Sequence, residues 1–155
     1  MKVSPLQLKR HVMPEVACTA NSDYEPSRII ELNENSFKAQ SRAKRMETQA
    51  DDASSEWAVE LIVSQESDPV SNVSYAFRIV LVGTFVYATH PANVPEEVFV
   101  KTNGSSILYG IAREIIRSLT ASGPWGALLI PTISFYGEPA QVPDVVEGAE
   151  RKSAD

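Results

Sequence analysis

The chain has 155 residues, a length that suits one domain with a sizeable core. Its apolar fraction of 43% and charged fraction of 22% are those of an ordinary globular protein. The net charge of −6 argues against nucleic acid as a partner, because binding a phosphate backbone needs a basic surface. No apolar run approaches the ~18 residues of a membrane span, and the N-terminus lacks the apolar core of a signal peptide. We therefore expect a cytoplasmic protein without membrane insertion.

The N-terminal region shows the alternation that predicts a half-buried strand. In residues 6–18 the even positions are mostly apolar and the odd positions mostly polar. Pro14 lacks an N–H group and therefore predicts an edge position or a bulge. Cys18 falls on the apolar side, where we expect a buried structural thiol, and His11 falls on the polar side, where we expect an exposed side chain. Residues 21–26 have the composition of a loop.

Three more alternating segments follow. Residues 36–48 predict a strand with a basic outer face, although their composition also allows a helix. After a turn, residues 56–64 alternate cleanly, and residues 66–72 close a hairpin onto the longest alternating row, residues 75–87. Gly83 lies inside this row, where it predicts a bulge or the close approach of another segment.

One long helix is expected after the strands. Residues 95–100 predict a short helical turn or strand, and the main helix then begins with Ser105 or Ser106 as its N-cap. Gly123 and Pro124 end it. Its apolar residues fall on one broad stripe that would face the sheet. These residues are Ile107, Leu108, Ile111, Ala112, Ile115, Ile116 and Leu119.

The C-terminal region changes character twice. Residues 125–135 are mainly apolar, with an extended break at Pro131, and must be buried. Residues 138–155 are rich in Pro, Glu, Asp and Ala, which predicts a disordered acidic tail after a domain of residues 1–137. The expected fold class is α+β, a four-stranded antiparallel sheet followed by a long helix packed on one face.

Residues suited to catalysis are few. The chain has two histidines and one cysteine, and it carries no known catalytic, metal-binding or nucleotide-binding motif. We therefore expect no enzyme activity, no metal and no cofactor. The charged pair Arg113 and Glu114 is expected to be a solvated helix surface. The basic run at residues 38–45 has no interleaved aromatic residues, so RNA binding is not expected.

The apolar content exceeds what this simple fold buries readily. One helix covers one face of a four-stranded sheet only partly, and the row at residues 75–87 becomes apolar on both faces toward its end. Part of this surface is expected to form a subunit interface or a groove for apolar segments.

The spacing of residues 107–135 is specific. The segment contains an Ile-Leu pair, then Ala-Arg-Glu, then a glycine with an aromatic residue two positions later, and then a Leu-rich segment with a proline that ends in Phe. The matching positions are Ile107-Leu108, Ala112-Arg113-Glu114, Gly123, Trp125, Leu128-Leu129-Ile130-Pro131 and Phe135. In these features, and in Gly83-Thr84-Phe85, the chain resembles the SecB family of protein-export chaperones.

The resemblance implies a homotetramer, a dimer of dimers with helices sandwiched between sheets. It also implies an ATP-independent holdase that binds unfolded polypeptides or preproteins without a cofactor. Apolar surface can bind many sequences, because burial is not directional. The residues expected to bind clients have aromatic or large apolar side chains. They are Phe85, Tyr87, Phe99, Trp125, Leu128, Ile130 and Phe135.

The chain also departs from the family pattern. Acidic positions on the family's sheet contact the ATPase SecA, and Glu15 keeps one of them as an expected docking residue. Thr19 and Arg78 stand at two others, and the family's second helix has no counterpart after Phe135. A chaperone dedicated to one client, such as an antitoxin, is therefore an alternative. An assembly subunit that kept the fold and lost client binding is another.

Overall fold

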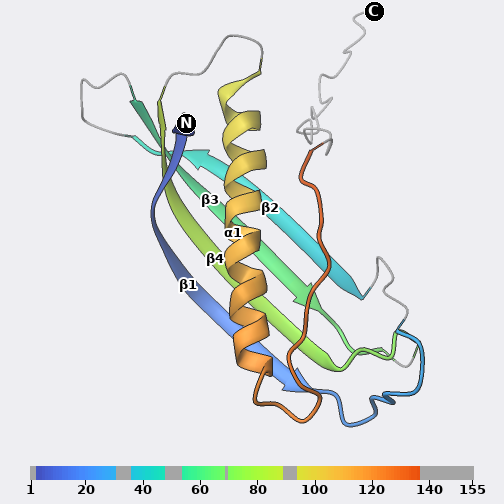
Figure 1. Ribbon diagram of the computed structural model, residues 1–155. Helices are drawn as coiled ribbons and strands as arrows, with labels where there is room; N and C mark the ends of the chain where they lie inside the picture. Colours follow the sequence, from blue (N-terminus) through green and yellow to red (C-terminus); the bar gives the residue numbers. More distant parts are fainter. Residues whose placement is uncertain (1–2, 31–35, 48–53, 69, 89–93, 137–155) are drawn as a thin grey trace, which may run out of the picture.

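The computed structural model describes residues 3–30, 36–47, 54–68, 70–88 and 94–136. In this part of the chain four strands precede one helix, and the helix lies across one face of the sheet (Figure 1). The elements are β1 (Leu6–Ala20), β2 (Phe37–Arg45), β3 (Ser54–Gln65), β4 (Tyr75–Ala88) and α1 (Glu96–Thr120). All neighbouring strands are antiparallel, in the order β1-β4-β3-β2. The expected α+β class is confirmed, and so is the strand at β2.

The two central strands, β3 and β4, form the floor of the core. Every second residue of β3 is buried, and the row of β4 that was predicted from alternation is buried as well. Val59 pairs with Gly83, Leu61 with Leu81 and Val63 with Ile79, so these side chains face α1 together. A one-residue shift in register would turn this apolar set toward the opposite face, and the alternation therefore fixes the pairing.

Gly83 marks the close approach that its position in β4 predicts. A Cβ atom there would lie 2.9 Å from Cδ2 of Leu108 on α1 and 2.7 Å from Cε2 of Phe85. Gly104 has the same role on the helix, where a Cβ atom would lie 2.9 Å from Cγ2 of Val59. The two glycines let the helix and the sheet lie closer than larger residues would permit.

β1 is only partly covered. Leu6 is buried, but every residue of the strand after Leu8 is exposed, because α1 lies mainly over the other three strands (Figure 1). The register shifts between Val12 and Glu15, which confirms the bulge predicted at Pro14.

The structure agrees with the prediction for His11 of β1 but not with the prediction for Cys18. The exposed position of His11 agrees with the prediction. The buried position expected for Cys18 is wrong, since its thiol is exposed at the uncovered half of the strand. Partial desolvation still raises the pKa of the Cys18 thiol. His90 and the predicted tail at residues 138–155 lie outside the described residues.

The helix begins earlier than its sequence suggests. α1 starts at Glu96 after Pro95, and the first turn carries two carboxylates that suit the positive end of the helix dipole. The N-cap predicted at Ser105 or Ser106 is therefore wrong, and Ser105 is fully buried inside the helix. The pair Asn103-Gly104 has the composition of a break, yet this glycine serves helix–sheet contact. In the part of the chain that the structure describes, no helix has the length and apolar character needed to cross a membrane.

The stripe by which α1 contacts the sheet is narrower than predicted. Leu108, Ala112 and Ile116 are fully buried, as expected. Ile107 and Leu119 are exposed, so their assignment to the buried stripe is wrong. A single helix touches a flat sheet along a line, and residues at the margins of a broad stripe remain in contact with solvent.

Gly83→Ala is expected to lower the free energy of unfolding by about 1–3 kcal/mol, because the added methyl overpacks the helix–sheet contact. Alanine would otherwise stabilise a strand interior by ~0.5–1 kcal/mol relative to glycine. Urea unfolding measures the difference. Gly104→Ala, with fewer close contacts, is expected to cost less. An unchanged or more stable Gly83→Ala variant would contradict the close approach.

Candidate functional site

Residues 127–136, called the strap from here on, run antiparallel to α1 along one of its flanks (Figure 1). Near the end of the helix, the backbone N–H of Leu128 donates a hydrogen bond of 2.7 Å to Oγ1 of Thr120. Further back along the helix, the hydroxyl of Tyr109 donates a hydrogen bond of 2.6 Å to the carbonyl oxygen of Pro131. These two bonds fix the direction of the strap.

Some side chains of the strap are buried in the core and others are exposed to solvent. Ile130 is 2% exposed and Phe135 6%, and both belong to the core that α1 forms with the sheet. The Phe135 ring meets the Tyr109 ring edge-on, with centroids 5.9 Å apart. Leu129, by contrast, is 72% exposed. The strap therefore resembles a strand with one buried side, although it is not part of the sheet.

The inner face of β2 carries small residues. Ala39, Ser41 and Ala43 pair with Val63, Leu61 and Val59 of β3 and are half-buried. These short side chains leave room above β2 for larger ones from another segment. Of the three, Ala43 packs against the core cluster that includes Ile130 and Phe135.

Nearly all the residues predicted to bind clients lie in or against this core. Those that are buried in it are Phe85, Tyr87, Ile130 and Phe135. Phe99 and Leu128 are half-buried and pack against it. The structure therefore brings these six side chains together, but it covers most of them with the chain itself. Their role in client binding stays a prediction.

Trp125 lies apart from this set, at the start of the C-terminal segment. Its indole N–H donates a hydrogen bond of 2.9 Å to the carbonyl oxygen of Asn21, and its ring meets that of Tyr24 with centroids 5.2 Å apart. Its backbone N–H donates to the hydroxyl of Tyr75. Trp125 thus joins the loop after β1 to Tyr75 at the start of β4.

Tyr109 is a site residue that the sequence analysis missed. It lies beside the predicted stripe, one position after Leu108, and its ring is buried. Burial raises the pKa of Tyr109 to about 12, while the positive charge of Arg113 opposes this shift. Its spacing could have revealed it, because Tyr109 lies four positions after Ser105 and three before Ala112, and residues so spaced share one side of a helix.

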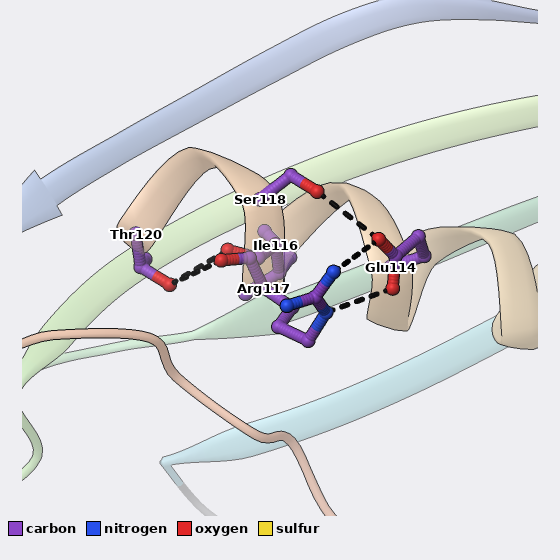
Figure 2. A network of polar contacts seen from close by, with 5 residues as sticks. All are labelled: Glu114, Ile116, Arg117, Ser118 and Thr120. Atoms are coloured by element: carbon purple, nitrogen blue, oxygen red, sulfur yellow. Dashed lines mark hydrogen bonds and ion pairs between the residues drawn. The ribbon is translucent and has the colours of Figure 1, made fainter. Parts of the chain in front are cut away.

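Near the end of α1, the polar contacts on its exposed side differ from those on its buried side (Figure 2). On the exposed side, Arg117 donates hydrogen bonds of 2.9 and 2.7 Å to the carboxylate of Glu114, and this lowers the pKa of Glu114. Arg113 is also exposed, so the predicted solvated surface is confirmed. On the other side, the buried hydroxyl of Thr120 donates to the carbonyl oxygen of Ile116 and accepts the bond from the strap.

The outer face of the sheet, away from α1, carries carboxylates that are each paired with a cation. Glu15 accepts a hydrogen bond of 3.0 Å from Arg78, the position of charge reversal. The same face holds two more ion pairs. Lys9 of β1 reaches across β4 to Glu56 of β3, and Arg42 of β2 pairs with Glu60 of the neighbouring β3. Exposed pairs contribute little to stability, about 0–1 kcal/mol each, but they neutralise the carboxylates. A docking role for Glu15 stays a prediction.

Among the described residues, no group of three or more His, Cys, Asp or Glu side chains is placed to hold a metal ion. A polar hollow of about 390 Å³ lies between the loop after β1 and the loop before β4. Its floor is formed partly by Asn72, whose side chain is hydrogen-bonded to the backbone of Glu25 and Arg28. The hollow is therefore explained as a junction of two loops.

No protein-family model matches this sequence, and no curated protein matches it. Solved structures do match. The SecB-like chaperone Rv1957 of Mycobacterium tuberculosis, in complex with a ChAD peptide from the antitoxin Rv1956 HigA1, aligns with a TM-score of 0.53 at 13% identity. The alignment covers 87% of this chain and 93% of that chain. This chain has a SecB-like fold. A Streptococcus agalactiae protein of unknown function aligns over 82% of this chain and 97% of its own, with a TM-score of 0.57 at 10% identity.

Tyr109 predicts a dependence of stability on pH. Its pKa is about 12 in the folded protein and ~10 in an unfolded chain. The stabilisation is therefore complete below pH ~10 and is lost as the pH rises toward ~12, because the unfolded chain ionises first. Urea unfolding at pH 8 and pH 11.5 is expected to show a loss of up to about 2 kcal/mol that Tyr109→Phe lacks. Parallel losses in the two proteins would contradict the assignment.

Proposed function

We propose that this protein is an ATP-independent chaperone that holds unfolded polypeptides in an extended conformation. The observation that carries the proposal is the strap. An extended apolar segment packs Ile130 and Phe135 between α1 and the sheet without joining the sheet. The surface beneath is therefore suited to extended chains, which are what a holdase binds. The SecB-like fold supports the same function.

The binding energy would come from burial. Removing one large apolar side chain from water stabilises a complex by roughly 1.5–3 kcal/mol, and no directional contact is needed. A few such side chains in an extended segment give useful affinity, with selectivity for apolar content rather than for one sequence. Holding a chain in this way needs neither a cofactor nor a catalytic group.

Within this class, the neutralised outer face favours a chaperone dedicated to one client over a general export chaperone. Glu15 is engaged by Arg78, and Glu56 and Glu60 are engaged by Lys9 and Arg42. A face that is meant to attract a basic partner surface would present unpaired carboxylates. The complex of Rv1957 with an antitoxin peptide shows that a SecB-like chaperone binds such a client. Under this proposal, the protein is not expected to dock onto SecA.

We also propose that the protein is a homo-oligomer, a tetramer in the cytoplasm. Its open surfaces support this. Val16 and Met13 are exposed on β1, at one edge of the sheet. On α1, Ile107 and Leu119 are exposed, and a Cβ atom at Gly110 would meet nothing within 4 Å. A second copy that paired along β1 and packed on α1 would cover these residues.

Suppression of aggregation tests the chaperone proposal. The purified protein at a stoichiometric ratio is expected to slow the aggregation of a chemically unfolded apolar protein, without ATP, as light scattering measures. Addition of ATP is expected to change nothing. If the protein left the aggregation rate unaltered, the assembly-subunit alternative would replace the holdase.

Light scattering also tests the assembly. Val16→Asp is expected to reduce the mass toward that of one chain, 17.0 kDa, because a charge would be buried at the β1 edge. Ala17→Asp is the matched control, since the neighbouring residue points to the outer face and should leave the assembly intact. A wild-type mass of 17.0 kDa would exclude the oligomer.

A further inference from the structure

We propose that the strap occupies the site in which this protein holds its client, so that a client binds by displacing the strap. The inference rests on the proposed chaperone function and names how the site is controlled. The occupant to be expected is an extended segment of an unfolded chain with aliphatic and aromatic side chains at the strap's spacing. In the strap these are Leu128, Ile130, Ile133 and Phe135, on either side of Pro131.

The first argument is that the strap is held as a bound peptide is held. Two of its side chains, Ile130 and Phe135, are almost fully enclosed, while the neighbouring Leu129 is exposed. Among the described residues, however, only two hydrogen bonds join its backbone to the rest of the protein, those to Thr120 and from Tyr109. Both partners are side chains of α1. The strap can therefore leave without breaking a ladder of backbone bonds, which a core strand cannot do.

The second argument is that the strap shares one apolar core with the residues that a client would need. Phe85, Tyr87 and Phe99 are the aromatic residues of the sheet and helix that were predicted to bind clients, and they lie in or against the same core as the strap. The small residues Ala39 and Ala43 of β2 would remain as an open floor after its departure. An apolar segment from outside would find the same room and the same partners.

A displaced strap has a thermodynamic consequence. If only the open form binds, the apparent dissociation constant is the intrinsic constant divided by the open fraction. A variant that weakens closure therefore binds a client more tightly, by the factor by which the open fraction rises. A strap that is merely part of the core has the opposite effect, because weakening it damages the binding surface.

Thiol labelling tests displacement directly. Ile130→Cys and Leu129→Cys are made separately in a Cys18→Ser background, and the probe is reduced, carboxymethylated lactalbumin, which stays unfolded. The thiol at position 130 is expected to be protected in the free protein and to react at least tenfold faster with saturating probe, because 130 is buried only while the strap is closed. The thiol at 129 is the matched control, already exposed and unaffected by the probe.

Affinity gives a second readout in a variant that keeps the core. Tyr109→Phe retains the ring against Phe135 and removes the hydrogen bond to Pro131. Loss of one hydrogen bond of ordinary net strength is expected to tighten probe binding about fivefold, measured by fluorescence anisotropy of the labelled probe. Unchanged or weaker binding by Tyr109→Phe would overturn the proposal.

The outcomes separate the two proposals. If the wild-type protein fails to bind the probe and fails to slow aggregation, the chaperone function itself is wrong. If the probe binds while the thiol at position 130 stays protected, the function stands and the strap is a permanent part of the fold. Faster labelling together with tighter binding by Tyr109→Phe supports displacement.

Discussion

The structure depends on the close contact between α1 and the two central strands. Gly83 on β4 receives Leu108, and Gly104 on α1 rests against Val59 and Phe85. Because both glycines lack a side chain, the helix lies low enough to bury a line of residues from one end to the other. The strap can then fill the space that remains beside the helix. If the helix stood further from the sheet, Ile130 and Phe135 would find no enclosed position.

The sheet could be predicted from the sequence because its strands obey a period of two. β3 and β4 are buried on the side that faces α1, and the alternation of their residues shows this directly. Pro14 likewise predicts the irregularity between Val12 and Glu15 of β1. A proline has no N–H group to donate to a neighbouring strand, whatever the rest of the fold. Such features are local, and local features can be recovered from one sequence.

The errors came from interactions between distant segments. Cys18 lies on the apolar side of its strand, but whether that side is covered depends on where the helix crosses the sheet. The sequence predicts a helix start after Gly104, because a glycine resembles a break. The contact of Gly104 with Val59, which explains the glycine, is visible only in the folded structure. The predicted client-binding residues show the same limit. Composition identifies apolar side chains, but it does not tell whether solvent, a partner or the chain's own strap covers them.

The inner and outer faces of the sheet thus have different roles. Inside, the apolar residues are shared between stability and the proposed binding of clients, so a substitution there affects both. Outside, the ion pair of Glu15 with Arg78 and its neighbours are exposed and contribute little to folding. Changes on the outer face can therefore alter partners without destabilising the fold.

The bulge at Pro14 has a consequence for any chain that meets the free edge of β1. Edge strands can nucleate uncontrolled sheet growth, and an edge as long as this one carries that hazard. Together with a second shift between Leu8 and Arg10, the bulge divides the strand into residues 6–8, 10–12 and 15–20, which follow different registers along β4. An incoming strand meets three short, offset segments instead of one continuous template. Pairing is then confined to finite partners, and fibrillar stacking of this protein, or of the unfolded chains around it, is disfavoured.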